Sequence, residues 1–251
     1  MFKKILIQNI EKILKGYENS FFEKSIKLNF TSILRPGFWI TENIGNNSFS
    51  FNTGKKIFVA PIIEGSQKDI EIGENIVFTD LTDKKKESSV GLKYFVCGYS
   101  KKSKTPIFIC DNHNYVLEVW ELLKNKKLPL VHIDQHKDNQ IFTENEQDWR
   151  KTTKICNYIN FAQKRGWINE VISFTESSDL KQLSFIKPEK CILNIDLDLF
   201  HPDCSLISLE EKLNIIYNYL PKAELITIAT SPLFIDQNLA VKLAKLFWQY
   251  L

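Results

Sequence analysis

From residue 105 to the end of the sequence, short apolar runs alternate with stretches whose apolar residues recur at helical spacing. The apolar runs predict buried strands at residues 106–110, 128–134, 170–174, 191–199 and 224–230. The stretches between them predict helices at residues 115–124, 152–165, 208–219 and 237–250. Strands that alternate with helices and are apolar throughout are typical of a mainly parallel sheet covered on both faces. We therefore expect an α/β fold with three layers, α/β/α.

The beginning of the sequence has a different pattern. Apolar positions at helical spacing predict a helix over residues 4–15, with Gly16 as its end. The run KKKESS at residues 84–89 is typical of a solvated loop. From about residue 30 the chain is rich in Asn, Gly, Ser, Phe and Thr, and three segments predict short strands joined by turns: GFWIT, SFSFNTG and KKIFVAPII.

The length of the chain favours one compact domain over residues 1–251. Within it, residues 1–104 would form a β-rich N-terminal portion of undetermined role. Residues 105–251 would form the α/β core that carries the chemistry. The composition, 43% hydrophobic and 25% charged, is that of a globular protein and excludes a disordered chain.

Charge and cysteine content restrict the partners and the compartment. The formal net charge of +3 gives no indication of nucleic acid or membrane as a partner. Five cysteines, an odd number without a CxxC pair, indicate free thiols in a reducing compartment. The apolar run at the start is broken by Gln8 and Asn9, and no segment reaches the roughly 18 apolar residues that span a bilayer. We therefore expect a cytoplasmic location, and a homo-oligomer is compatible with the sequence.

Candidate metal ligands follow three of the predicted strands of the core. One strand ends in the motif DQHKD and another in DLD, and a histidine follows a third strand. Residues two apart on an extended backbone point to the same side, and sites in open α/β sheets form beyond the carboxyl ends of strands. The six candidate ligands are His113, Asp134, His136, Asp138, Asp196 and Asp198.

These residue types suit a pair of divalent cations. Two cations roughly 3.5–4 Å apart can share bridging carboxylates and activate a water molecule. Four aspartates would balance the charge of two divalent cations, and would repel one another without them. Oxygen ligands with two imidazoles suit Mn²⁺, with Zn²⁺ and Fe²⁺ as alternatives, and the lack of a cysteine ligand disfavours a structural zinc site. The ordinary alternative is two solvated or capping motifs, which the preceding apolar runs disfavour because unpaired charge is costly there.

At these motifs the sequence resembles the ureohydrolase superfamily, which comprises arginases, agmatinases and the histone-deacetylase-like amidohydrolases. Arginases share a metal histidine after the first core strand, a D-x-H-x-D motif and a D-x-D motif, and CDNHNY, DQHKD and DLD are similar to them. The resemblance implies an arginase-like fold with two Mn²⁺ ions bridged by Asp134 and Asp196. One ion would be held by His113, Asp134, Asp138 and Asp196. The other would be held by Asp134, His136, Asp196 and Asp198.

Longer phrases resemble the peptide arginases, which convert arginine side chains within a peptide to ornithine and release urea. These phrases are DNHNYVLEVW, LVHIDQHKDN, ICNYINFAQKRGWINEV and ITIATSP, so the resemblance spans about residues 105–235. It implies a peptide substrate that contains arginine. It also implies that Asp138 accepts a hydrogen bond from the attacking water.

The sequence departs from the free-arginine arginases in two places. Residues 227–232 lack the carboxylate that grips the guanidinium in those enzymes, and no histidine lies between His136 and His201. A guanidinium has a fixed charge and five donors, so it needs an anionic partner. Asp236 and Glu176 are the candidates for this substrate-binding role.

Three further residues have both a functional and a structural interpretation. His132, two positions before Asp134, could support a metal ligand or be a satisfied core histidine. His201 could donate a proton to the leaving group or be a loop residue beside Pro202. Asn157 could contact the substrate or be a polar residue on a helix face.

The alternatives to a peptide arginase differ in the bond cleaved or in the class of protein. A hydrolase of the same fold could act on agmatine-like amidines, formimino groups or acyl amides. A Mn²⁺-dependent glycosyltransferase could use the DLD motif, but it leaves DQHKD and His113 without a role. A peptide-binding module could keep the metals for stability and have no turnover.

Overall fold

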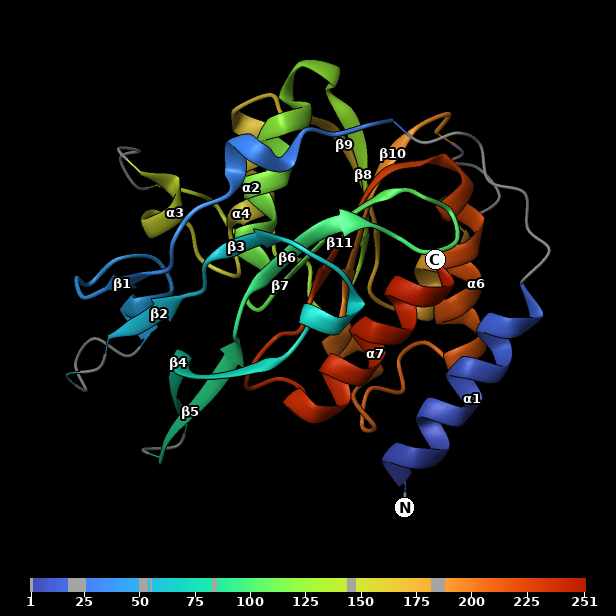
Figure 1. The fold of residues 1–251 in the computed structure, drawn as a ribbon, viewed down its shortest axis with the longest axis horizontal. Coiled ribbons are helices and arrows are strands. Elements are labelled where there is room, and N and C mark those ends of the chain that lie inside the picture. Colours follow the sequence, from blue (N-terminus) through green and yellow to red (C-terminus); the bar gives the residue numbers. More distant parts are fainter. Residues whose placement is uncertain are drawn as a thin grey trace.

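The computed structural model of the chain describes residues 2–17, 26–49, 54, 56–82, 85–143, 148–181 and 188–251. At its centre lies a seven-stranded sheet (Figure 1). Its strands, in order across the sheet, are β3 (Ile62–Glu64), β6 (Phe95–Tyr99), β7 (Pro106–Cys110), β11 (Ala223–Ala229), β10 (Cys191–Asp196), β8 (Leu128–Ile133) and β9 (Ile168–Phe174). All neighbouring strands are parallel except β6 and β7.

Helices cover both faces of this sheet, as Figure 1 shows. On one side lie α1 (Phe2–Gly16), α6 (Leu209–Tyr219) and α7 (Gln237–Tyr250), and on the other α2 (Leu117–Trp120) and α4 (Tyr158–Lys164). The strands alternate between two hydrophobic cores: Ile107 and Ile109 of β7 pack on the first side, Phe108 and Cys110 on the second. The expected three-layer α/β/α fold with a mainly parallel sheet is therefore confirmed.

Two of the predicted helices are shorter in the structure, and contacts with distant segments interrupt the second of them. Residues 113–126 form two 3₁₀ turns, η5 (His113–Val116) and η6 (Glu121–Lys126), on either side of α2. The helix predicted over 152–165 is instead α3 (Trp149–Thr152) followed by α4. Between them, the carbonyl of Thr153 accepts a hydrogen bond from Asn114, and the amide of Ile155 donates to Asn46. These contacts occupy backbone groups that a continuous helix would need.

The N-terminal portion contributes β3 and β6 to the central sheet and forms two small antiparallel sheets of its own. One pairs β1 (Phe38–Ile40) with β2 (Ile57–Val59), as GFWIT and KKIFVAPII predict. The other pairs β4 (Ile72–Thr82) with β5 (Lys85–Leu92). The prediction of a loop at KKKESS is wrong over residues 85–89, which pair with β4, and residue 84 lies outside the described residues. The predicted strand SFSFNTG is also wrong where it is described: residues 45–49 form a 3₁₀ turn, η2, and 50–53 lie outside the described residues.

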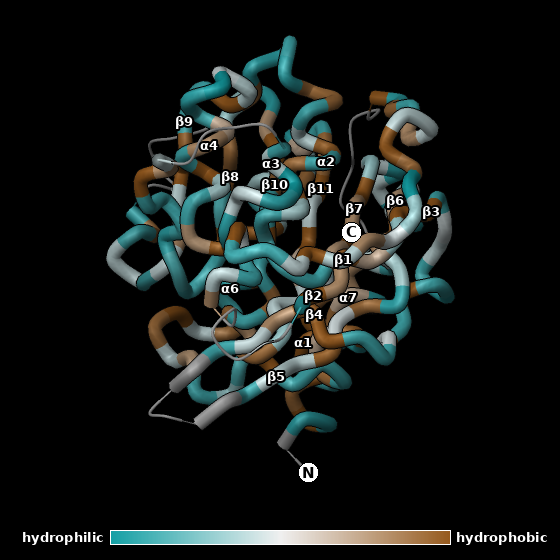
Figure 2. Tube along the Cα trace, turned by 90° about the vertical axis from the view of Figure 1, so that its left-hand side faces the viewer, coloured by the Kyte–Doolittle hydropathy of each residue, from teal (hydrophilic) through white to brown (hydrophobic). Residues whose placement is uncertain are grey.

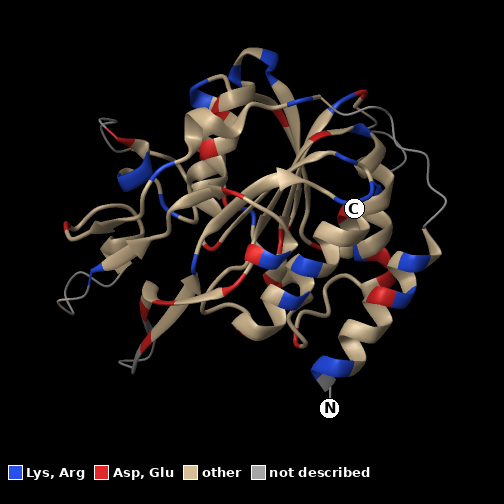
Figure 3. Ribbon diagram, in the orientation of Figure 1, with Lys and Arg blue, Asp and Glu red and all other residues tan. Residues whose placement is uncertain are grey.

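Charged and polar residues lie mainly outside the central sheet. In Figure 3 the strands of the central sheet are largely tan, and the coloured segments lie mainly on helices and loops. Polar stretches, teal in Figure 2, make up much of the outer turns. Among the described residues, no helix combines the length and apolar character needed to cross a bilayer.

Candidate metal centre

The six candidate ligands meet at the edge of the sheet where parallel strands end. Asp134 directly follows β8, and Asp196 is the last residue of β10. Asp198 lies in the 3₁₀ turn η8 (Leu197–Phe200), and His113 begins η5 after β7. Because β7, β11, β10 and β8 are all parallel, their carboxyl ends share one edge, where sites of α/β sheets form.

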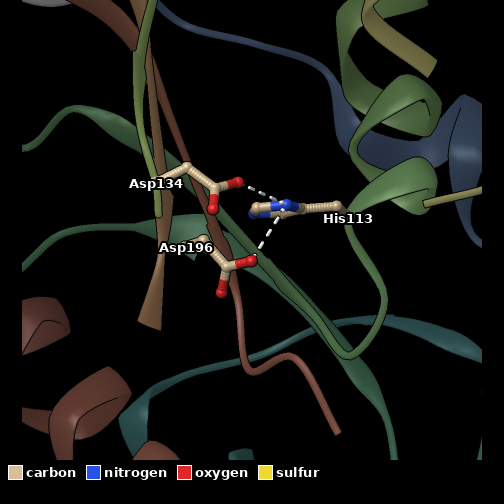
Figure 4. A group of neighbouring side chains, drawn as sticks. All are labelled: His113, Asp134 and Asp196. Carbon is tan, nitrogen blue, oxygen red and sulfur yellow. Dashed lines mark ion pairs between the residues drawn. The ribbon is translucent and has the colours of Figure 1, made fainter. Parts of the chain in front are cut away.

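His113 is the centre of the first group of ligands. Figure 4 shows its imidazole facing the carboxylates of Asp134 and Asp196. The Nδ1 atom of His113 lies 3.2 Å from Oδ2 of Asp134, 3.1 Å from Oδ2 of Asp196 and 3.1 Å from Oδ2 of Asp138. The three carboxylates and the imidazole therefore converge on one point.

His136 is the centre of the second group. Its Nδ1 lies 3.1 Å from Oδ2 of Asp198 and 3.5 Å from Oδ1 of Asp134. Asp134 thus belongs to both groups and turns one oxygen toward each histidine. Both arrangements have ligand atoms close enough together to hold a metal ion.

The spacing of two in each motif has a backbone cause. Oδ1 of Asp134 accepts a hydrogen bond of 2.8 Å from the amide of His136, and Oδ1 of Asp196 accepts one of 2.9 Å from the amide of Asp198. Each first aspartate therefore fixes the turn that follows its strand. The second oxygen of each carboxylate, Oδ2, remains directed toward His113.

Burial makes this concentration of charge costly. Asp134 is fully buried, and Asp198 is 1% exposed. Within the described part of the chain, Oδ2 of Asp134 and Oδ1 of Asp198 are buried and make no hydrogen bond. Buried polar atoms normally have partners, so these oxygens fit a group that the side chains themselves do not supply.

The pKa values show how the cluster behaves on its own. Burial, and next the charge of Asp198, raise the pKa of Asp196 well above its ordinary value. Burial, together with the charge of Asp134, raises the pKa of Asp198 to about 6. Hydrogen bonds to Asp134 and Asp198 raise the pKa of His136 to about 11. Burial alone would lower the pKa of His113, but Asp196 and Asp134 raise it well above its ordinary value. The cluster therefore retains protons, and divalent cations could take their place.

A row of buried polar side chains crosses the central sheet just before the strands reach the ligands. This polar row holds the DQHKD turn in position. His132, Asn194 and Thr227 are cross-strand neighbours on β8, β10 and β11. Thr227 Oγ1 donates to Asn194 Oδ1 at 2.7 Å, and Asn194 Nδ2 lies 3.0 Å from Nδ1 of His132 and donates to the hydroxyl of Tyr158 at 3.2 Å. All four side chains are buried.

The other ring nitrogen of His132 reaches the candidate ligands. Nε2 lies 3.0 Å from the backbone carbonyl of His136 and 3.4 Å from Oδ2 of Asp134. A carbonyl only accepts, so Nε2 carries the proton and Nδ1 accepts from Asn194. Burial lowers the pKa of His132, which is consistent with a neutral ring. Both interpretations of His132 are thus partly right: it is a satisfied core histidine, and it supports the turn that carries the ligands.

Ser231 belongs to the centre although the sequence did not single it out. Its Oγ donates to Oδ2 of Asp196 at 2.6 Å, and its backbone has a φ of +44°. Asp138 has a φ of +45°. Positive φ in residues other than glycine is strained, and such strain is concentrated at functional sites. The available signal was the position of Ser231 just beyond β11, at the same sheet edge as the ligands.

All of the candidate ligands except Asp134 line a cavity of about 370 Å³, here called the central pocket. The remainder of its wall consists of Asn112, Lys137, Asn139, Gln140, Ile155, Cys156, Ser231 and Phe234. Asn157, a candidate substrate contact, is not part of this wall: its side chain accepts a hydrogen bond from the amide of Lys154 before α4. Among the described lining residues, every carboxylate is a candidate ligand.

The structure does not bring the other predicted site residues to the central pocket. Asp236 caps α7 through the amide of Leu239 and pairs with Lys3 at 2.8 Å. Glu176 is exposed and accepts a hydrogen bond from Ser178. His201 accepts one from the amide of Asp203 and lines two other cavities. Local caps and turns account for all three, so neither the guanidinium-binding role nor the proton-donor role gains support from their positions.

Comparison with known proteins gives little further information. No protein-family model matches the sequence, and no curated protein matches it. Among solved structures, the chain is similar to a hypothetical agmatinase from Burkholderia thailandensis, with 15% sequence identity and a TM-score of 0.43. The match covers 57% of this chain and 56% of that chain, so the likeness extends over little more than half of either protein.

Proposed function

We propose that this chain is a metal-dependent hydrolase of the ureohydrolase type, which converts arginine side chains of a peptide to ornithine and releases urea. The supporting observation is the place of Asp134, whose two oxygens face His113 and His136 in two His/Asp groups. A carboxylate shared in this way suits a bridging ligand of a two-metal centre. The motifs that deliver these residues follow the order found in arginases.

The residues present fit two divalent cations. The buried carboxylate oxygens without hydrogen bonds and the raised pKa values of Asp196 and Asp198 both favour added positive charge. Mn²⁺ is our choice, because carboxylate oxygens outnumber imidazoles in the donor set. One ion would be held by His113, Asp134, Asp138 and Asp196. The other would be held by Asp134, His136, Asp196 and Asp198. When bound, the pair would supply Lewis-acid activation of the attacking water.

The side chains around the ligands would position the substrate. The volume of the central pocket, about 370 Å³, lies within the range of small-molecule sites, roughly 300–1,000 Å³. Ile155 and Phe234 would contact the methylene groups of an arginine, and the amides of Asn139 and Gln140 would bond its guanidinium. Asp138, at the pocket wall, would accept a hydrogen bond from the attacking water.

The test is metal analysis of the purified protein together with mass spectrometry of a peptide that contains arginine, incubated with the protein and Mn²⁺. We expect close to two metals per chain and a loss of about 42 Da per arginine, the CH₂N₂ that departs in urea. The same peptide with lysine in place of arginine should keep its mass. One metal or none per chain would contradict the two-metal centre, and two metals without a mass change would contradict the peptide-arginase activity.

One observation favours a second candidate function, hydrolysis of an acyl amide, which is uncharged, by the same centre. The described wall of the central pocket has no carboxylate beyond the candidate ligands to balance a guanidinium. Agmatine, a formimino compound and an acetyl-lysine peptide are the informative substrates. Release of acetate, with arginine peptides unchanged, would replace the first proposal by the second.

A further inference from the structure

A second cavity, of about 450 Å³, adjoins the central pocket. One wall is formed by Ser88, Ser89 and Val90 of β5, and the opposite wall by residues 233–238, which connect β11 to α7. Phe234 lines both cavities. We call this second cavity the flanking groove. Because Phe234 belongs to the walls of both cavities, the groove lies beside the central pocket.

Side-chain contacts fix the β4–β5 hairpin against the central pocket. Asn112, a residue of the pocket wall, donates from Nδ2 to the carbonyl of Val77 in β4 at 3.1 Å. Gly91 of β5 approaches so closely that a Cβ there would lie 2.4 Å from a carboxylate oxygen of Asp111. Only glycine permits this approach, so the hairpin and the site residues are packed as one unit.

Aromatic rings extend this connection from the N-terminal portion to a candidate ligand. The ring centroids of Phe49 and Phe78 are 5.5 Å apart, those of Phe78 and Phe234 5.9 Å, and those of Phe234 and His136 5.7 Å. Aromatic pairs at such distances pack favourably. The groove is therefore formed before any ligand binds, at a fixed place relative to the ligands.

The strand that lines the groove is an edge strand. In the part of the chain that the structure describes, β5 pairs with β4 alone, in a two-stranded sheet. Its residue Val90 is 37% exposed, which is high for an apolar side chain at a cavity wall. An edge strand beside a groove can take up an additional extended strand through its backbone groups, while side chains determine specificity.

We infer that the flanking groove binds the extended polypeptide segment next to the residue that enters the central pocket. This inference rests on the proposed function, because it requires the reactive side chain to belong to a peptide. A free amidine would occupy the central pocket alone. A peptide would place its reactive side chain in that pocket and its neighbouring residues along β5, between Val90 and the start of α7.

The experiment compares two substrates on three variants. Val90→Glu places a charge in one wall of the groove, and Asn238→Arg places a long charged side chain in the other. Ile5→Glu is the matched control, because Ile5 is an exposed apolar residue of α1, outside the groove. The substrates are a long peptide with a central arginine and Nα-acetyl-arginine amide, and the Mn²⁺-loaded full chain is used throughout.

We expect Val90→Glu and Asn238→Arg to lower kcat/KM for the long peptide about tenfold, with little change for acetyl-arginine amide. Ile5→Glu should behave as the wild type with both substrates. Equal kcat/KM values of all variants for the long peptide would overturn the inference. So would an equal loss for the two substrates, because the groove would then not distinguish a peptide from a single residue.

A binding measurement separates failure of the groove from failure of the proposed activity. If the wild type converts neither substrate, the peptide-arginase proposal fails. Fluorescence anisotropy of a labelled long peptide then decides on the groove by itself. Binding to the wild type that is weakened about tenfold by Val90→Glu supports it, and binding that is absent or unaffected by that variant overturns it.

Discussion

This protein contains two buried clusters of charged side chains. They differ in whether every carboxylate oxygen has a cationic partner from the chain itself. The side chain of Glu118 in α2 is fully buried, and its carboxylate accepts hydrogen bonds from Arg35 at 2.8 Å and from Arg150 at 3.0 and 3.2 Å. Arg35 also donates to the carbonyl of Ala60, so the cluster ties the N-terminal portion to the α/β core. Every carboxylate oxygen of this cluster has a cationic partner from the chain itself.

In the cluster at the sheet edge, carboxylates outnumber the cationic side chains. Four aspartates share two imidazoles, and buried oxygens of Asp134 and Asp198 make no hydrogen bond within the described residues. Isolated buried charge is too costly to persist without compensation. A carboxylate that is bound by its own arginines is part of the scaffold, whereas carboxylates that outnumber the cationic side chains around them are candidates for binding added cations.

The largest expected effect comes from removing a carboxylate of the incomplete cluster. Asp196→Asn should lower kcat roughly 10⁴-fold, equivalent to about 5.4 kcal/mol, because a bridging ligand is lost. The metal-free variant should unfold at a temperature no lower than the metal-free wild type, since burial disfavours the charged form of Asp196 and asparagine carries no charge at all. Turnover assays and thermal unfolding in a chelator measure the two effects, and retained turnover would contradict the ligand assignment.

Removing the carboxylate of the Glu118 cluster should have the opposite effect, a loss of stability that does not depend on metal. Glu118→Ala leaves two arginines without their carboxylate and should destabilise the fold by about 3 kcal/mol, near the lower end for buried pairs because both arginines keep some contact with water. The loss should be the same with and without metal, as measured by urea unfolding. A loss that Mn²⁺ abolishes would mean that Glu118 acts through the metal centre and not through the scaffold.

Removal of the metal ions should destabilise the protein, and the size of this loss should depend on pH. Saturation at 100 times Kd stabilises a fold by about 2.7 kcal/mol, so a chelator should lower Tm. The folded-state pKa of Asp198 is raised from 3.8 to about 6, and that of His136 from 6.5 to about 11. Both groups bind protons more tightly when folded, so metal-free stability falls as pH rises from about 4 through 6 and beyond. The difference in Tm between metal-loaded and metal-free protein should therefore widen with pH, and a constant difference would contradict this origin.

The smallest effect is expected from the polar row beneath the ligands. His132→Phe keeps the ring but removes the hydrogen bond to the carbonyl of His136, and should weaken Mn²⁺ binding about 10- to 100-fold. Tyr158→Phe deletes a hydroxyl that bonds to Asn194 and not to the DQHKD turn, so it should have less effect. Isothermal titration with Mn²⁺ measures both. Equal affinities for the His132 variant and the wild type would mean that the turn holds its shape without this bond.

Local chemistry accounts for the elements that the sequence predicted well. Strands β7, β8, β10 and β11 are apolar because both of their faces are buried, and that pattern is visible without any coordinates. Helix α6 begins at Leu209, close to the predicted start at residue 208, and Ser208 caps it through a capping box with Glu211. The DQHKD and DLD motifs fix their own turns through short-range hydrogen bonds, so the sequence alone could indicate that their side chains act together.

The same local signals explain the errors. A run of lysines and serines indicates a loop, but residues 85–89 form a strand because β4 offers them a backbone partner. Asp236 and Glu176 have the negative charge that a guanidinium needs. In the structure, however, Asp236 accepts a hydrogen bond from the first turn of α7, and Glu176 accepts one from the hydroxyl of Ser178. Local caps and turns thus decide whether a polar side chain is free to meet a ligand.

The sequence by itself therefore determined the alternation of strands and helices, the three-layer fold and the identity of the six residues that gather at one sheet edge. These follow from periodicity and from spacing within single strands, which are local properties of the chain. Only the tertiary structure decided that Ser231 and His132 support that cluster, that Asp236, Glu176 and His201 lie outside the central pocket, and that the β4–β5 hairpin forms a wall of the flanking groove. Each of these depends on strand order and on contacts between distant segments, because a side chain's partners are set by the packing of the whole sheet.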